Sequence, residues 1–248
     1  MAERSVDVNG ATLWITETGV GEPIILSNGG PGCCDYLEPV ASMLDDRSLV
    51  YRWEQRGCGR SSAAGPFDLA TTLRDLDDLR EALGHDRWIV GGHSWGATLA
   101  LIYAMAFPER THAVIMIAGR GLQNDRSWQD AYHTGRDAGL DQVPTMAHPY
   151  NHEVNRVLNA DSKTYIRRPT LWRDLANLRV PALTVDGAAD IRPAWPNEQI
   201  AELLPCSTYL RIEGAGHCPW FTHAGELRDH LQGFLDTLPD RNHDRARR

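Results

Sequence analysis

Apolar and polar residues along the chain form alternating blocks that predict strands and helices in turn. Short runs rich in branched and aromatic residues predict strands at 12–18, 24–27, 49–53, 88–91, 113–118, 182–186 and 208–212. Leucines repeat at helical spacing from Leu69 to Leu83, and further helices are expected at 97–107, 197–204 and 225–238. This order is typical of the α/β class, with a mostly parallel sheet covered by helices on both faces.

The pattern changes after Gly119. From Arg120 to Trp172 the chain is polar, aromatic and weakly periodic, and it is interrupted by several prolines. We expect a small helical lid at 120–172, inserted into a single core domain formed by 1–119 and 173–238. The charged end, 239–248, lacks apolar anchors and is expected to be disordered.

Composition narrows the possible partners. The 248 residues suit one domain, and 25 basic against 33 acidic residues give a net charge of −8. A negative surface disfavours nucleic acid and anionic membranes, so a small-molecule substrate is the expected partner. The first residues do not show the basic start and apolar stretch of a secretory signal, and no apolar run is long enough to span a bilayer. A cytoplasmic location is therefore expected. The sequence leaves the oligomeric state open.

Cysteine and histidine spacing indicates neither disulfides nor metal. The five cysteines include no Cys-x-x-Cys pair, and the ten histidines form no His-Glu-x-x-His helix. We therefore expect five free thiols, no metal and no cofactor.

The strongest chemical signal is the segment Gly92-His93-Ser94-Trp95-Gly96, which lies between a predicted strand and a predicted helix. Small residues two before and two after Ser94 permit the sharp strand-to-helix turn that exposes a nucleophilic serine in α/β-hydrolases. His93 adjoins the nucleophile and so points elsewhere on such a turn, which indicates a supporting role.

A second signal follows the strand at 24–27, where the chain reads Asn28-Gly29-Gly30-Pro31-Gly32. In this fold the loop after that strand donates one backbone N–H to the oxyanion, and the residue after the nucleophile donates the other. The oxyanion hole is therefore expected at the N–H groups of Gly30 and Trp95.

The acid and the base are expected on glycine-rich loops after later strands, in the order serine, acid, histidine. Asp190 follows the strand at 182–186, and His217 follows the strand at 208–212. In a triad His217 accepts the serine proton and Asp190 orients its ring. Asp186, at the end of its strand, is the competing candidate for the acid.

These motifs resemble those of the proline iminopeptidase branch (serine peptidase family S33) of the α/β-hydrolases. That branch carries His-Gly-Gly-Pro-Gly, Asp-Gln-Arg-Gly-x-Gly-x-Ser and Gly-Gly-Ser-Trp-Gly, where this chain has 28–32, 54–61 and 92–96. The resemblance covers the core on both sides of the lid and implies the α/β-hydrolase fold with a Ser94–Asp190–His217 triad. Asn28, Glu54 and His93 depart from the family pattern. The lid is also much shorter than the helical cap whose acids bind the substrate amine in that family.

The sequence favours a serine hydrolase that cleaves an ester or amide of a small acyl substrate through an acyl-enzyme. Its pocket is expected to include Gly29, Trp128, Tyr132, Glu153, Trp172 and Trp220. One alternative is a proline iminopeptidase, with Glu153 as the first candidate for the amine site. Lactonases, C–C hydrolases and acyltransferases use the same triad, and a ligand-binding receptor on this scaffold is the alternative outside enzymes.

Overall fold

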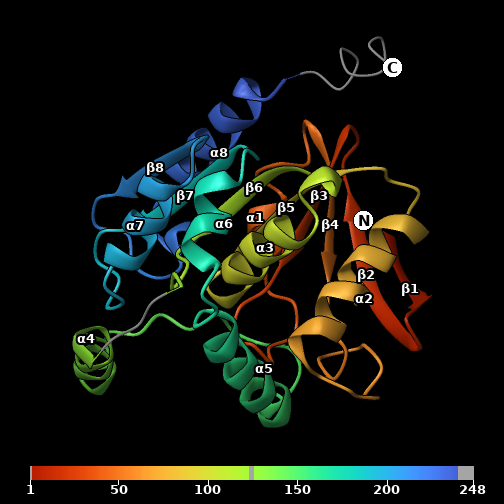
Figure 1. The fold of residues 1–248 in the computed structure, drawn as a ribbon, viewed down its shortest axis with the longest axis horizontal. Helices are drawn as coiled ribbons and strands as arrows, with labels where there is room; N and C mark the ends of the chain where they lie inside the picture. The colour runs from red at the N-terminus through yellow and green to blue at the C-terminus, as the bar shows by residue number, and fades with distance from the viewer. Residues whose placement is uncertain (1, 123–125, 240–248) are drawn as a thin grey trace.

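The sheet at the centre of the molecule has eight strands, in the order β1-β2-β4-β3-β5-β6-β7-β8. The computed structural model describes residues 2–122 and 126–239 (Figure 1). β2 pairs antiparallel with β1 and β4, and the remaining neighbours pair parallel. The strands are β1 (Ala2–Val8), β2 (Ala11–Thr18), β3 (Glu22–Ser27), β4 (Ser48–Trp53), β5 (Trp88–His93), β6 (Thr111–Ile117), β7 (Ala182–Gly187) and β8 (Ser207–Ile212).

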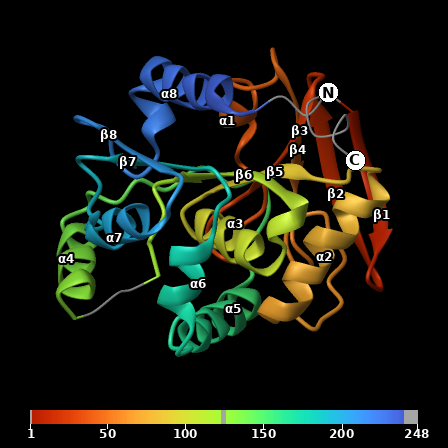
Figure 2. The same cartoon turned by 45° about the horizontal axis from the view of Figure 1, so that its top comes forward.

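Helices cover both faces of this sheet (Figure 2). On one face lie α1 (Glu38–Ala41) and α8 (Ala224–Thr237), and on the other lie α2 (Leu69–Ala82), α3 (Trp95–Ala106) and α7 (Trp195–Leu203). Each face has its own apolar cluster, because alternate residues of the central strands point to opposite sides. Short 3₁₀ turns span Pro108–Arg110 and Pro219–Phe221.

The predicted fold class is confirmed, and the expected strands and helices are present within about two residues at each end. The sequence analysis missed β1, a strand at the edge of the sheet. Most of its side chains are exposed, so it carries no apolar alternation to signal a strand. The prediction of disorder at 239–248 lies outside the described residues, apart from Pro239.

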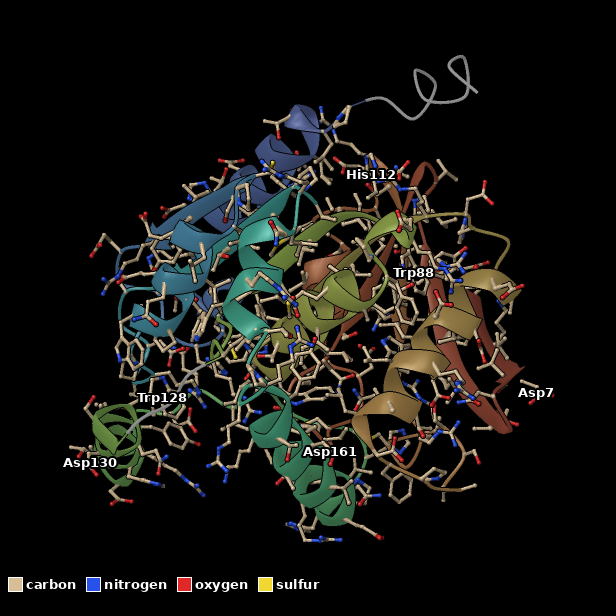
Figure 3. The ribbon with its side chains drawn as sticks, viewed as in Figure 1. Asp7, Trp88, His112, Trp128, Asp130 and Asp161 are labelled. Carbon is tan, nitrogen blue, oxygen red and sulfur yellow. The ribbon has the colours of Figure 1, made fainter. Side chains whose placement is uncertain are left out.

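The segment between β6 and β7 (residues 118–181, the β6–β7 segment below) contributes no strand among its described residues. It carries α4 (Arg126–Asp137), α5 (His152–Tyr165) and α6 (Leu171–Asn177). Figure 3 labels Trp128 and Asp130 on α4 and Asp161 on α5. The Asp161 carboxylate accepts the backbone N–H of Leu69 at 2.9 Å, which joins α5 to the start of α2. None of the described helices is long and apolar enough to cross a membrane.

Three buried arginines of the core are paired with carboxylates. Arg56, 3% exposed, donates two hydrogen bonds of 2.6 Å to the carboxylate of Asp75, which lies on α2. Arg52 pairs with Asp35, and Arg80 pairs with Asp77. A buried guanidinium without such a partner is strongly destabilising, so the Arg56–Asp75 pair is part of what holds the loop after β4 against α2.

Candidate active site

Ser94 stands at the turn between β5 and α3, in a backbone conformation that a side chain rarely adopts (φ 57°, ψ −118°). The turn requires glycine on both sides. A Cβ on Gly96 would lie 1.9 Å from the carbonyl oxygen of Ser27, and one on Gly92 would lie 2.4 Å from the carbonyl carbon of Gly96. The Ser94 N–H donates to the oxygen of Ile117 at 2.9 Å, which fixes the turn against β6, and Ser94 itself remains partly exposed.

His217 and Asp190 meet at the carboxyl ends of β8 and β7. The Nδ1–H of His217 donates to Oδ2 of Asp190 at 2.6 Å, which leaves Nε2 as the proton acceptor. Two backbone bonds join the loops, from Ala188 to Ile212 and from Ala189 to Ala215. This arrangement matches the tautomer that a catalytic base needs.

The two groups have pKa values suited to an ion–neutral pair. Burial lowers the pKa of His217 below its ordinary value, and this outweighs the opposing effect of Asp190. Burial alone would raise the pKa of Asp190, but the hydrogen bond from His217 and the charges around it bring the pKa below its ordinary value. Near neutral pH, the pair therefore consists of a carboxylate and a neutral imidazole.

Asp186, the competing candidate, is engaged elsewhere. Its carboxylate accepts hydrogen bonds from Nδ2 of Asn197 at 2.9 and 3.0 Å and from the hydroxyl of Tyr209 at 3.2 Å. Burial raises its pKa to about 7. Asp186 thus ties the end of β7 to α7 and β8, while Asp190 contacts the histidine.

The glycine loop after β3 approaches the serine closely, since a Cβ on Gly29 would lie 3.0 Å from that of Ser94. The Gly29 N–H donates to the Tyr36 hydroxyl at 2.6 Å. By contrast, the N–H groups of Gly30 and Trp95 donate no hydrogen bond within the part of the chain that the structure describes. They are the pair expected to receive an oxyanion.

Three asparagines hold this loop in place by hydrogen bonds. Nδ2 of Asn28 donates to the Cys33 oxygen at 2.7 Å. Nδ2 of Asn155, on α5, donates to the Pro31 oxygen at 2.9 Å. The backbone N–H of Asn151, the residue before α5, donates to the Gly32 oxygen at 2.9 Å. The start of α5 is thereby fastened to the loop expected to bind the oxyanion.

His93 connects the glycine loop to the histidine loop. Its Nε2 lies 2.8 Å from the carbonyl oxygen of His217, and its Nδ1 lies 2.7 Å from the Tyr36 hydroxyl. A carbonyl can only accept, so Nε2 carries the proton and Nδ1 accepts from Tyr36. Tyr36 in turn accepts from Gly29, which completes a chain of three hydrogen bonds across the site. Burial lowers the pKa of His93 well below its ordinary value, which keeps this tautomer neutral.

The β6–β7 segment also contacts the acid and histidine loops. Nη1 of Arg192 bridges Asp190 at 3.1 Å and Asp141 at 2.9 Å, and its guanidinium stacks 4.8 Å from the ring centroid of Tyr132. Oε1 of Gln142 accepts the N–H of Cys218, the residue after His217, at 3.0 Å. The segment therefore touches the loops on both sides of Ser94.

The predicted pocket residues occupy several different places. Gly29 lies against Ser94, and Tyr132 stacks on Trp128 at 5.5 Å and on Arg192. Trp220 is buried and packs edge-on against His93 at 4.7 Å, so it supports the turn. Glu153 is exposed in the first turn of α5.

Trp172 lies at a different surface. It lines a groove of about 850 Å³ between α6 and α7, together with Trp195 and Glu198, and no member of the predicted triad lines that groove.

The sequence analysis missed Tyr36, Gln142 and Arg192. Tyr36 and Gln142 belong to no motif, and their hydrogen bonds span seven and 76 residues of chain. For Arg192 the sequence did contain a signal. A basic residue two positions after the predicted catalytic acid Asp190 could have been expected to pair with that carboxylate.

Comparison with known proteins agrees with this fold. Residues 22–162 match the family model described as alpha/beta hydrolase fold. The proline iminopeptidase of Heyndrickxia coagulans is 36% identical over 290 residues, covering 95% of this chain and 99% of that protein. A second relative, the proline iminopeptidase of Xylella fastidiosa (strain 9a5c), is 38% identical over 114 residues; these cover 44% of this chain but only 35% of that protein. Among solved structures, a thermophilic esterase from Thermogutta terrifontis has a TM-score of 0.76 at 20% identity, covering 95% and 98% of the two chains, which is a likeness of fold.

The fold and the matched family model make this protein a hydrolase of the α/β-hydrolase class. Within that class, the chain belongs to the family of the alpha/beta hydrolase fold and is homologous to the proline iminopeptidases, as the resemblance of its motifs predicted. The chain spans about a third of the length of the Xylella relative.

The hydrogen-bond chain through Tyr36 can be tested by stability. Tyr36→Phe leaves the Gly29 N–H and Nδ1 of His93 without partners at buried positions, and we expect a loss of about 1–3 kcal/mol in the free energy of unfolding. Tyr51→Phe is the matched control, because its hydroxyl bonds the partly exposed His85, where water can substitute; about 1 kcal/mol or less should be lost. Urea denaturation compares the two, and equal losses would contradict the proposed role of the chain.

Proposed function

We propose that this protein is a serine hydrolase that cleaves an ester or amide bond of a small acyl substrate, with Ser94 as nucleophile, His217 as base and Asp190 as orienting acid. The observation that carries the proposal is the 2.6 Å bond from His217 to Asp190, at the carboxyl edge of the sheet where the Ser94 turn also stands. The unbonded N–H groups of Gly30 and Trp95 support it.

The reaction follows from these groups. Nε2 of His217 takes the hydroxyl proton of Ser94 as Oγ attacks the substrate carbonyl, and the resulting oxyanion accepts hydrogen bonds from Gly30 and Trp95. Asp190 stabilises the imidazolium that forms. His217 then gives the proton to the leaving alcohol or amine, and an acyl-enzyme is left. Water, deprotonated by His217, releases the acid and restores Ser94.

The acidic side chains of the β6–β7 segment favour a substrate without a free amine. Asp141 is paired with Arg192, and Asp161 accepts the N–H of Leu69. Glu153 and Asp130 are exposed, and Figure 3 shows Asp130 on the outer side of α4. An ammonium group must be desolvated on entry and needs a buried carboxylate to offset that cost. We propose that residues 120–172 act as a lid over a site for neutral or anionic acyl groups.

A proline iminopeptidase is the second candidate. It is favoured by the 36% identity to the Heyndrickxia coagulans enzyme, which extends along nearly all of both chains. Glu153 is the first residue to examine in that case. Lactone, C–C and acyl-transfer chemistry would use the same three residues, and a receptor that has lost catalysis would keep the fold alone.

The nucleophile is tested first. Ser94→Ala removes the attacking oxygen, so we expect turnover of p-nitrophenyl esters to fall by about three orders of magnitude or more with the fold retained. Wild type should also be labelled by a fluorophosphonate, and Ser94→Ala should not. Circular dichroism confirms the fold of the variant. Near-normal activity in Ser94→Ala, or an unlabelled wild type, would reject the proposal and favour a receptor.

The acid is tested by a matched pair of substitutions. Asp190→Asn favours the wrong imidazole tautomer, and a loss of up to about 10⁴-fold in kcat is expected. Asp186→Asn alters a carboxylate held by Asn197 and Tyr209, and kcat should change far less. Steady-state kinetics on one ester decides between them, and a larger loss in the Asp186 variant would move the acid there.

The pH dependence follows from the lowered pKa of His217. The base works only when neutral, and burial lowers its pKa below 6.5, so the neutral fraction persists at lower pH than for a free histidine. We expect kcat/KM for an uncharged ester to lose half its value on the acid side at a pH below 6.5. A midpoint above 6.5 would show that a different group controls the acid limb.

Substrate preference separates the two candidate activities. Relative to each substrate's uncatalysed rate, kcat/KM for a short-chain p-nitrophenyl ester should exceed that for proline p-nitroanilide, because the described lid carboxylates are either bonded within the protein or exposed to water. A normalised preference for the anilide would establish the aminopeptidase instead. Glu153→Gln would then show whether that acid binds the amine, with Asp130→Asn as the exposed control.

A further inference from the structure

The guanidinium of Arg192 lies between the acid of the proposed triad and the β6–β7 segment. Its Nη1 donates to Oδ1 of Asp190 at 3.1 Å and to Oδ1 of Asp141 at 2.9 Å. The backbone N–H of Arg192 donates to the same Asp190 oxygen at 3.0 Å. The other oxygen, Oδ2, accepts from His217. The acid is therefore bonded on one side to the proposed base and on the other to Arg192.

The side chains of this group are shielded from water. Their exposed fractions are 13% for Arg192, 14% for Asp141, 7% for Asp190 and 5% for His217. Water and salt screen charges at such positions much less than charges at the surface. A change in one of these charges should therefore be felt by the others.

Asp141 belongs to a segment that is fastened to both the acid loop and the histidine loop. The next residue, Gln142, accepts the N–H of Cys218 at 3.0 Å. On α4, Gly135 packs against the acid loop, since a Cβ there would lie 2.6 Å from the Cβ of Ile191. Several contacts besides the ion pair thus hold Asp141 against Arg192.

The net charge next to the imidazole of His217 is set by three of its neighbours. The charged and titratable groups that face the ring are Asp190, Arg192, Asp141, His93 and Cys218. Burial lowers the pKa of His93 well below its ordinary value and raises the pKa of the Cys218 thiol to about 12, so neither carries a charge near pH 7. Glu213, on the same loop as His217, is exposed. The two carboxylates and the guanidinium remain.

The charges of this group balance only after proton transfer. Asp190, Asp141 and Arg192 together carry a net charge of −1 while the imidazole is neutral, and the sum is zero once His217 holds the proton from Ser94. The surplus negative charge lies on the Nδ1 side of the ring, away from Nε2. Without Asp141 the group would be neutral before the transfer and positive after it, which disfavours the imidazolium.

We propose that Arg192 is a positioning residue for Asp190, and that Asp141 of the β6–β7 segment completes the charge balance under which the imidazolium forms. This rests on the proposed function and gives the segment a part in catalysis besides covering the site. Rapid turnover then requires Asp141 to be docked on Arg192, so the chemical step is coupled to the position of the segment.

Charge-changing substitutions test the proposal through the acid midpoint of kcat/KM for an uncharged p-nitrophenyl ester. Asp141→Asn leaves the group neutral, so the midpoint should fall by about half a unit to one unit, and kcat should fall with it. Arg192→Met leaves a charge of −2 and should move the midpoint up. The double variant restores −1, and its midpoint should return towards that of wild type. A purely structural role would make the double variant worse than either single variant.

Asp174→Asn is the matched control, because it removes a carboxylate from another arginine pair of the β6–β7 segment, Arg168–Asp174. Its midpoint should equal that of wild type. Circular dichroism checks that each variant is folded. The proposal is overturned if Asp141→Asn does not move the midpoint, if it moves it in the same direction as Arg192→Met, or if Asp174→Asn moves it equally.

Titration of His217 by NMR separates this proposal from the catalytic assignment. The ring is titrated in the Ser94→Ala protein, where its signal is identified by its absence after a further His217→Gln change. Adding Asp141→Asn should lower the pKa of His217, and adding Arg192→Met should raise it. If the ring responds in this way but Ser94→Ala retains near-normal activity, the proposed function fails and the charge coupling stands. If Ser94→Ala is inactive and the ring does not respond, the coupling fails and the proposed function stands.

Discussion

The backbone at Ser94 governs the arrangement of every other part of the site. A residue with a side chain is held at φ 57° because β5 and α3 meet at a sharp angle, and because Gly92 and Gly96 leave room for Ser27 and for each other. The bond from Ser94 to Ile117 fixes the turn to the neighbouring strand. The close packing around the two glycines and this hydrogen bond together hold the Ser94 backbone in its strained conformation. The serine is thereby presented at the carboxyl edge of the parallel strands, where the loops of β3, β7 and β8 also end.

A second layer of hydrogen bonds makes those loops one unit. The chain from Gly29 through Tyr36 and His93 to the His217 carbonyl links the expected oxyanion donor loop to the expected base. His93 can serve only as a neutral group here, because its Nδ1 must accept and its Nε2 must donate. Burial secures that state, so a residue beside the proposed nucleophile contributes by holding the loops together and not by transferring a proton.

Charge is distributed unevenly around the site. Arg192 lies between Asp190 and Asp141, so the acid of the proposed triad and the proposed lid share one cation. Arg120 lies beneath α5 with a neutral partner. An enzyme that bound an amine would need the opposite arrangement, an uncompensated acid near the serine. Asp186 is also buried without a cationic partner, but Asn197 and Tyr209 already hold its carboxylate. The proposed substrate is therefore neutral or anionic, although the homologues are named for proline substrates.

The sequence by itself determined the α/β class, most strand and helix positions, and the local turn at Ser94, because each depends on short-range periodicity or on glycines at fixed spacing. It also ordered Asp190 and His217 correctly after their strands, although only the fold could show that Asp190, and not Asp186, contacts the imidazole. Edge strand β1 escaped detection since exposed strands carry no apolar alternation. The bonds of Tyr36 and Gln142 and the uncompensated charge of Arg120 depended wholly on tertiary structure. The bonds from Tyr36 to His93 and from Cys218 to Gln142 join residues 57 and 76 positions apart, and no local pattern encodes which distant groups a folded sheet will bring together.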